Sequence, residues 1–204
     1  MNDDAAQARR FHQNGDLASA EPYYMRAMEA HPNDPQIRHD YAVLLMQSRR
    51  EDHAIPLLRS VLHDSPERSD TATVLALCLR ATGNLDQGIV AANRAVSLDA
   101  RNALAWLIKG TLELKSGMAA ESEASLRRCL AIAPRLGEAW HYLGEVLQAQ
   151  HRWQEASHAY RNAMMDQPAE VMNVAICAEL SGQLEVAREG YRHMCRLRPE
   201  RSDC

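Results

Sequence analysis

Hydrophobic residues recur at helical spacing between residues 137 and 168. The apolar positions are Trp140, Leu143 and Leu147 in the first half of this stretch, and Ala156, Tyr160 and Ala163 in the second half. Positions about three, four and seven residues apart share one face of an α-helix. The pattern therefore predicts two amphipathic helices, roughly 137–150 and 153–166, and Pro168 is expected to end the second.

The same pattern returns every 34 residues, so that five units share one register. The second-helix positions of the four earlier units are Ala20, Tyr24, Ala27 and Pro32; Ala54, Leu58, Val61 and Pro66; Gly88, Ala92, Ala95 and Ala100; and Ser122, Leu126, Cys129 and Pro134. Small residues at a helix crossing let two backbones approach closely, which predicts one helical hairpin per unit. A sixth unit follows three residues early, with Gly182, Ala187, Tyr191, Met194 and Pro199.

The turns inside the hairpins carry glycine at the same spacing, as Gly15, Gly83 and Gly117. A left-handed backbone is readily adopted only by glycine. Arg49 and His151 stand at this place in their units, so their two turns are expected to be slightly strained or differently shaped.

Two prolines, Pro22 and Pro56, lie one repeat apart in the second helices of the first two units. Proline is tolerated in the first turn of a helix and is disruptive further inside. These two helices are therefore expected to begin near Ser19 and His53.

This recurring unit resembles the tetratricopeptide repeat, a helix-turn-helix of about 34 residues with Trp, Leu-Gly, Tyr, Ala and Pro positions in fixed order. In the fifth unit those positions are held by Trp140, Leu143, Gly144, Ala156, Tyr160, Ala163 and Pro168. The resemblance implies an all-α fold, a right-handed tetratricopeptide superhelix (α-solenoid) of about twelve antiparallel helices. A single domain is expected over residues 1–204, with repeats at about 1–34, 35–68, 69–102, 103–136, 137–167 and 168–201.

The charge and hydropathy of the chain argue against nucleic acid and membranes as partners. A formal net charge of -4 gives no general attraction for nucleic acid or anionic lipid. No apolar run approaches the ~20 residues that cross a bilayer, and the acidic start at Asp3 and Asp4 is unlike a secretion signal. We therefore expect no nucleic-acid partner, no membrane association and a cytoplasmic location.

The cysteines and histidines show no spacing typical of a metal or cofactor site, and we predict neither. Four of the five cysteines are expected to act as small buried hydrophobic groups, and Cys204 is expected to be exposed. The five are Cys78, Cys129, Cys177, Cys195 and Cys204. His141 and Glu145 stand four residues apart, yet one histidine and one carboxylate make an incomplete site. No glycine-rich phosphate loop, GxSxG or HExxH is present. The sequence therefore predicts a protein that is not an enzyme.

The resemblance implies that the first helices line a concave groove. The residues expected to line a partner-binding groove are His39, Val43, Met46, Leu77, Leu104, Leu107, Thr111, Leu114, His141, Glu145, Met172 and Ile176. Exposed leucines at Leu104, Leu107 and Leu114 would mark an interaction site for an apolar partner helix or extended peptide. The alternative is that these leucines are buried by helix packing.

Three functions fit these observations. The first is a non-catalytic scaffold or adaptor that binds a peptide or helix of a partner protein in its groove. The second is a substrate-recruiting module of a larger enzyme, because similar repeats are found fused to glycosyltransferases, sulfotransferases and aspartyl hydroxylases. The third is a self-assembling structural protein. A solenoid usually ends in a polar capping helix. Because none is expected after Pro199, the last repeat is expected either to form a homodimer or to continue into a longer polypeptide.

Overall fold

The computed structural model of the chain describes residues 3–164 and 170–197, and these fall into two compact units, 1–100 and 101–204. The helices of unit 1 are α1 (Asp3–Gln13), α2 (Leu17–Ala30), α3 (Pro35–Gln47), α4 (Glu51–Asp64), α5 (Ser69–Ala81) and α6 (Leu85–Leu98). Those of unit 2 are α7 (Ala103–Lys115), α8 (Ala119–Ile132), α9 (Gly137–Ala149), α10 (Trp153–Ala163), α11 (Val171–Leu180) and α12 (Leu184–Leu197). The predicted all-α class of about twelve helices is confirmed over the described residues.

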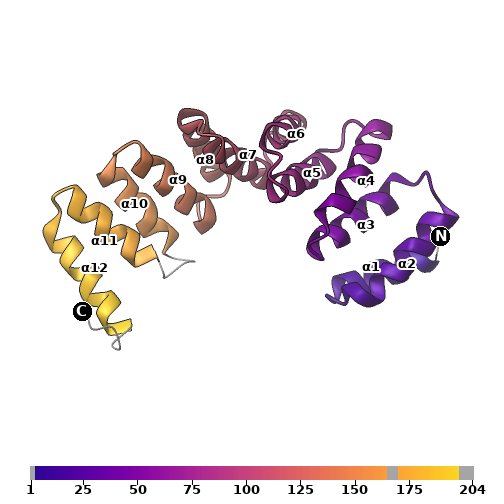
Figure 1. Cartoon of the computed structure of the whole chain (residues 1–204), viewed down its shortest axis with the longest axis horizontal. Helices are drawn as coiled ribbons and strands as arrows, with labels where there is room; N and C mark the ends of the chain where they lie inside the picture. Colours follow the sequence, from indigo (N-terminus) through magenta and orange to yellow (C-terminus); the bar gives the residue numbers. More distant parts are fainter. Residues whose placement is uncertain (1–2, 165–169, 198–204) are drawn as a thin grey trace. The chain divides into compact units, whose positions relative to one another are not determined.

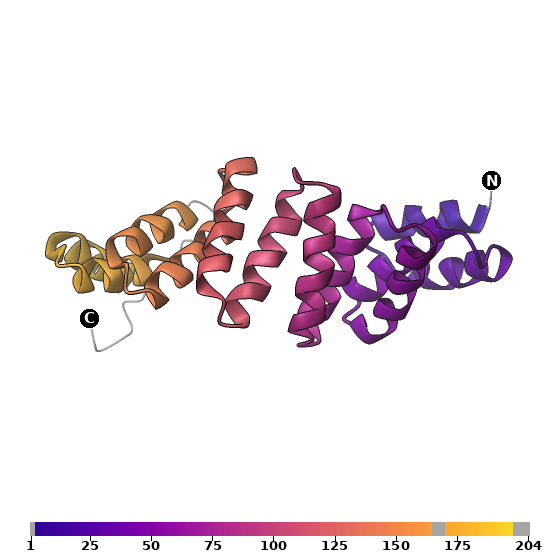
Figure 2. The same ribbon diagram turned by 90° about the horizontal axis from the view of Figure 1, so that it is seen from above.

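Consecutive helices pair as six antiparallel hairpins, numbered 1 to 6 from α1/α2 to α11/α12 (Figures 1 and 2). Within each unit every hairpin also packs on the next one, through α2 and α3, α4 and α5, α8 and α9, and α10 and α11. Each unit therefore repeats one local arrangement three times.

The turn glycines adopt the predicted left-handed backbone. Gly15, Gly83 and Gly117 have φ of 78°, 77° and 77°. Arg49 and His151 have φ of 59° and 60°, so the strain expected at these turns is confirmed while their shape is conserved. A positive φ is energetically unfavourable for a residue that has a side chain.

The expected starts of α2 and α4 were two residues too late. These helices begin at Leu17 and Glu51, which places Pro22 and Pro56 at the sixth helical residue. Each proline removes one backbone hydrogen bond. Burial of Tyr24 and its counterparts against the first helix keeps the helix continuous despite that loss.

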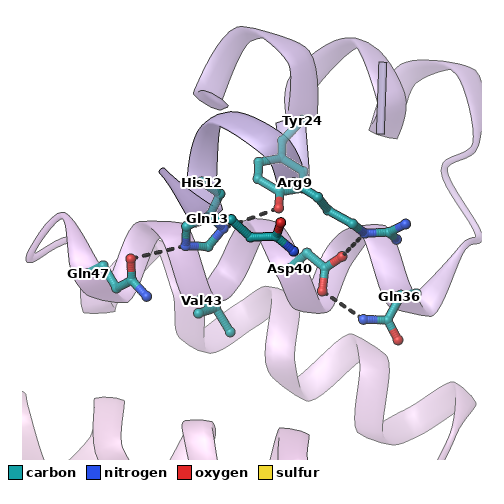
Figure 3. A pocket seen from close by; sticks show the side chains of 8 residues that line it. All are labelled: Arg9, His12, Gln13, Tyr24, Gln36, Asp40, Val43 and Gln47. Atoms are coloured by element: carbon teal, nitrogen blue, oxygen red, sulfur yellow. Dashed lines mark hydrogen bonds and ion pairs between the residues drawn. The ribbon is translucent and has the colours of Figure 1, made fainter. Parts of the chain in front are cut away.

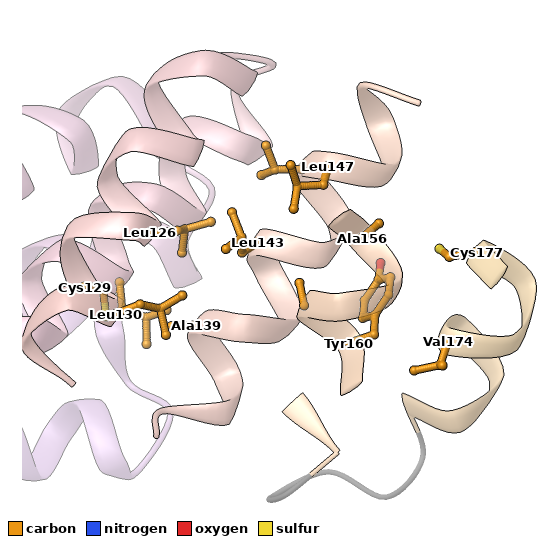
Figure 4. Close-up of a cluster of buried hydrophobic side chains, with 13 residues drawn as sticks. Leu126, Cys129, Leu130, Ala139, Leu143, Leu147, Ala156, Tyr160, Val174 and Cys177 are labelled. Atoms are coloured by element: carbon orange, nitrogen blue, oxygen red, sulfur yellow. The ribbon is translucent and has the colours of Figure 1, made fainter. Parts of the chain in front are cut away.

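Close helix crossings depend on glycine at the first helix. A Cβ added at Gly144 would lie 2.6 Å from the Tyr160 ring, and one at Gly110 would lie 2.7 Å from Leu126. In unit 2 Leu126 and Tyr160 belong to a hydrophobic core with residues from α7 to α11 (Figure 4). Unit 1 has its own core around Tyr24. The expected position of Pro168 lies outside the described residues.

The cysteines that the structure describes are buried free thiols, as expected. Cys78, Cys129 and Cys177 are fully buried. Burial raises the pKa of Cys78 to about 12 and that of Cys129 to about 11. The side chain of Cys195, and the whole of Cys204, lie outside the described part of the chain.

Candidate partner-binding sites

A cavity of about 600 Å³ lies between hairpins 1 and 2 in unit 1 (Figure 3). We call it the Arg9 cavity. Its lining comes from α1, α2 and α3 and consists of Arg9, His12, Gln13, Tyr24, Gln36, Asp40, Val43 and Gln47. Because three helices contribute to it, the cavity exists only where two successive hairpins are packed together.

An ion pair spans the Arg9 cavity. Arg9 Nε donates to Asp40 Oδ2 at 2.6 Å, and Gln36 Nε2 donates to Asp40 Oδ1 at 2.7 Å (Figure 3). The hydrogen bond with Asp40 raises the pKa of Arg9 above its ordinary value. Both carboxylate oxygens are thus occupied, and the charge inside this cavity is balanced.

A second chain of contacts crosses the same cavity. His12 Nδ1 lies 3.2 Å from the Tyr24 hydroxyl, and His12 Nε2 lies 3.0 Å from Gln47 Oε1. Burial raises the pKa of Tyr24. Gln13 lines the cavity and is exposed, and its side chain makes no hydrogen bond within the described residues. The cavity therefore offers neutral donors and acceptors suited to peptide groups.

A cavity of about 340 Å³ occurs at the equivalent place between hairpins 5 and 6 of unit 2. We call it the Glu145 cavity. Its lining consists of Glu145, Gln148, Ala149, Trp153, Tyr160 and Asn173. Four repeats of 34 residues carry the register from Arg9 to Glu145 and from Tyr24 to Tyr160. Asn173 is the counterpart of Asp40 after the three-residue slip of the last unit.

The tyrosine at this register position makes the same contact in three hairpins. Tyr160 donates from its hydroxyl to Gln148 Oε1 at 3.0 Å, and Tyr191 donates to Glu179 Oε2 at 2.6 Å. Tyr24 approaches His12 in the same way. In all three pairs the partner of the tyrosine stands twelve residues before it in the chain. The tyrosine hydroxyl thus orients a polar side chain near the end of the first helix.

His141 lies between two carboxylates beside the Glu145 cavity. Its Nδ1 is 2.8 Å from Glu170 Oε1, and its Nε2 is 3.2 Å from Glu145 Oε1. The hydrogen bond to Glu145, helped by the charge of Glu170, raises the pKa of His141. Asn173 Nδ2 donates to the other oxygen of Glu170 at 2.8 Å. This network joins α9 to α11.

Parts of the chain are similar in sequence to known proteins. The tetratricopeptide repeat family profile matches residues 5–70. The TPR repeat-containing protein YpiA of Bacillus subtilis strain 168 is 25% identical over 130 residues, which cover 64% of this chain and 30% of that protein. The chain thus spans about a third of the length of this relative.

Solved structures share the fold over most of the chain. The type IV pilus biogenesis factor PilW superposes with a TM-score of 0.83 at 18% identity, covering 98% of this chain and 94% of PilW. PilF of Pseudomonas aeruginosa gives a TM-score of 0.82 at 13% identity, with 97% and 91% covered. A MamA structure gives 0.72 at 20% identity, with 79% and 90% covered.

The chain is similar to the tetratricopeptide repeat family, whose profile it matches over residues 5–70. The recurring hairpins, the family profile and the matching folds agree on this. At these identities the solved structures define the tetratricopeptide fold alone, and the function has to be argued from the side chains.

The predicted groove residues of the tetratricopeptide hairpins fall into three classes. Those that are exposed are Leu104 and Ile176, and those that are half-buried are Val43, Met46, Leu77, Leu114, His141, Glu145 and Met172. The buried ones are His39, Leu107 and Thr111. Val43 lines the Arg9 cavity and Glu145 lines the cavity named after it.

The expected exposure of Leu107 was wrong. Leu107 is 2% exposed and belongs to the core cluster that also contains Leu126 and Ala139. His39, one of its equivalents two repeats earlier, is also buried, with Nδ1 2.9 Å from the Thr71 hydroxyl. This register position faces the neighbouring hairpin, so it belongs to the seam between hairpins and not to a free surface.

Thr111 was likewise wrongly expected to be accessible. It is buried, and its hydroxyl donates to the Ile108 carbonyl of its own helix at 2.9 Å. Leu104, at 48% exposure, is the accessible member of the predicted leucine surface. An apolar surface built from Leu104, Leu107 and Leu114 together is therefore not present in unit 2.

Val43 is the residue of the Arg9 cavity that belongs to the predicted groove set, and Gln13 and Gln47 are among those that the set leaves out. Gln13 and Gln47 stand one repeat apart at the last position of α1 and α3. Extending the 34-residue register by one more turn of the first helix would have found them. Within the described residues no helix is long and apolar enough to cross a membrane, and no three His, Cys, Asp or Glu side chains gather as metal ligands.

Proposed function

We propose that this chain is a non-catalytic scaffold that binds a peptide or helix of a partner protein on the side of its hairpins formed by the first helices. The recurrence of the lined cavity at the same register, between hairpins 1 and 2 and between hairpins 5 and 6, carries this proposal. Within each unit, successive hairpins repeat equivalent positions, which suits the binding of a partner segment there.

The chemistry of the cavity residues favours binding over catalysis. Asp40 has both oxygens paired, and burial raises the pKa of Tyr24, so neither is a poised base or nucleophile. Raised pKa values also keep the thiols of Cys78 and Cys129 protonated, whereas a reactive cysteine needs a lowered one.

Site-specific photocrosslinking tests the proposal. A benzophenone amino acid replaces Gln13, which is exposed inside the Arg9 cavity, and in a control chain it replaces Val90, which is 69% exposed on α6. Irradiation in cells is expected to give a discrete adduct from position 13 and none from position 90. The additional substitution Val43→Arg, which fills the cavity, should remove the adduct. Equal adducts from both positions would contradict specific binding at the cavity.

The same surface would serve a substrate-recruiting module of a larger enzyme. Immunoblotting of fractionated cells distinguishes the two roles and also tests the cytoplasmic location that we propose. A band near 22.9 kDa in the cytoplasmic fraction supports the free-standing scaffold. A much larger band supports the enzyme module.

Self-association through the last hairpin is a second candidate. Leu180 and Leu184, which flank the turn of hairpin 6, are 54% and 63% exposed. Paired large apolar groups at an end of a repeat array favour contact with a second copy. Light scattering across a concentration series should show a dimer that Leu184→Ser dissociates. A constant monomer mass would exclude this role.

A further inference from the structure

The two equivalent cavities differ in charge. In the Arg9 cavity the guanidinium of Arg9 neutralises Asp40 within the protein. At the equivalent places of the other cavity stand Glu145 and Asn173. The internal cation has thus become a carboxylate, and the internal carboxylate has become a neutral amide. Among its described lining residues, the Glu145 cavity therefore has no cation at the register position that Arg9 holds in the other cavity.

Glu145 is only partly neutralised by its neighbours. One oxygen faces His141 Nε2, while the other accepts no hydrogen bond from the described residues, and the side chain is 43% exposed. His141 is also shared with Glu170. Two carboxylates therefore compete for one imidazole, and even a protonated His141 leaves one negative charge at the cavity.

The remaining lining consists of Gln148, Ala149, Trp153, Tyr160 and Asn173, and the Gln148 amide oxygen already accepts from the Tyr160 hydroxyl. The amide nitrogen of Asn173 is used by Glu170, which leaves its amide oxygen as an acceptor in the cavity. Trp153 lines the same space with its half-buried indole. A carboxylate, an amide oxygen and an indole suit a group that has only donors and a positive charge.

We propose that the Glu145 cavity takes a Lys or Arg side chain of a bound partner segment. The free carboxylate oxygen of Glu145 accepts from the ammonium or guanidinium, and the alkyl stem packs beside Trp153. This assignment rests on the proposed function, since the cation belongs to the partner. It gives the partner segment a basic residue at the place where it crosses hairpins 5 and 6.

Amino-acid amides test the cavity without a partner. The full chain, labelled with ¹⁵N, is titrated with N-acetyl-lysine amide and N-acetyl-arginine amide, and with N-acetyl-norleucine amide as the uncharged control. The indole N–H signal of Trp153 is expected to shift and saturate with the two cations and not with norleucine amide. Signals of Trp106 and Trp140 serve as internal references. Equal shifts with all three probes would overturn the proposal.

Matched variants locate the charge. Glu145→Gln should weaken the binding of the cations at least about tenfold, because a hydrogen bond to a charged group contributes that much. Glu138→Gln removes the same charge from an exposed position on α9 outside the cavity and should change nothing. The double variant Glu145→Arg with Asn173→Asp rebuilds the internal pair of the Arg9 cavity and should abolish binding. Unchanged affinity in Glu145→Gln, with an unchanged melting curve, would reject the site.

The two proposals fail separately. If position 13 gives no specific adduct but lysine amide binds normally, the partner role is refuted and the cation site is retained. A normal adduct with no effect of lysine amide on Trp153 refutes the cation site and leaves the partner role.

Discussion

At the level of single residues, backbone strain is concentrated at two turns. Arg49 adopts a φ of 59° at the place where other hairpins have glycine, and its exposed side chain makes no hydrogen bond within the described residues. This conformation costs a non-glycine residue about 1 kcal/mol. Arg49→Gly should therefore raise the free energy of unfolding by roughly 1 kcal/mol, measured by urea denaturation.

The reverse change is the control for that prediction. Gly83 has a φ of 77° and open space where a methyl group would lie, so Gly83→Ala isolates the backbone effect. It should lower stability by about the same 1 kcal/mol. If both variants have the same free energy of unfolding as the parent chain, the backbone at these turns is not strained.

Burial separates two leucines that look alike in the sequence. Leu107 is in the core and Leu104 is half exposed on the same helix. Leu107→Glu should cost at least about 3 kcal/mol, because it removes core contacts and buries an unpaired charge. Leu104→Glu should change stability by no more than about 0.5 kcal/mol. Thermal melts followed by circular dichroism would contradict this if the two variants melted together.

Side-chain exposure was the part of the site that sequence alone could not give. The 34-residue register placed each residue on a helix, yet Leu107 and Leu104 are both apolar and only the angle of the next hairpin decides which one is covered. Their equivalents carry a weak signal: Gln36 and Asp70, in register with Leu104, are polar and exposed. The cavities were missed for the same reason, because they arise between hairpins.

At the level of helices, the crossing inside hairpin 5 depends on the absence of a side chain. Gly144 faces the ring of Tyr160, which is itself buried and fixed by Gln148. Gly144→Leu should cost roughly 1 to 3 kcal/mol, because the ring cannot move away without opening the crossing. The measurement is a melting curve of the variant beside Ala149→Leu, an exposed position on the same helix, which should melt like the parent chain.

The contact of α9 with α11 is predicted to depend on pH. The pKa of His141 is raised above its ordinary 6.5 by Glu145 and Glu170, so its charged form stabilises the folded state. This stabilisation is complete below pH 6.5 and disappears as the pH rises through the raised pKa. His141→Gln should therefore lower the melting temperature near pH 6 and have a smaller effect near pH 9. An effect that is constant over this range would contradict the ionic contact.

The helix pattern was the most predictable feature, since it depends on local periodicity. The hairpins and their turns follow directly from small residues and glycines spaced by 34. The starts of α2 and α4 could not be predicted in this way. Pro22 and Pro56 indicated later starts, whereas packing of the flanking hydrophobic residues extended both helices toward their N-termini. Tertiary contacts outweighed the local cost of proline there.

At the level of the whole molecule, the chain forms two compact units where the sequence predicted one domain over residues 1–204. That single domain stays a prediction. The boundary has a modest sequence signal. Ala100 stands where Pro32, Pro66 and Pro134 occupy the equivalent place, so the third repeat lacks its terminal proline. Nothing in helical periodicity reports how tightly one hairpin is joined to the next.

Separate expression of residues 1–100 and 101–204 tests how the stability is distributed. Each unit has three hairpins and its own core, around Tyr24 in one and around Leu126 and Tyr160 in the other. In a repeat array the stability is a sum over hairpins and their immediate interfaces, so each half should be helical and unfold cooperatively in urea. Because the urea dependence scales with the surface exposed, each half should show about half the m-value of a chain that unfolds as one. A half that is unfolded alone would show instead that both units belong to one cooperative domain.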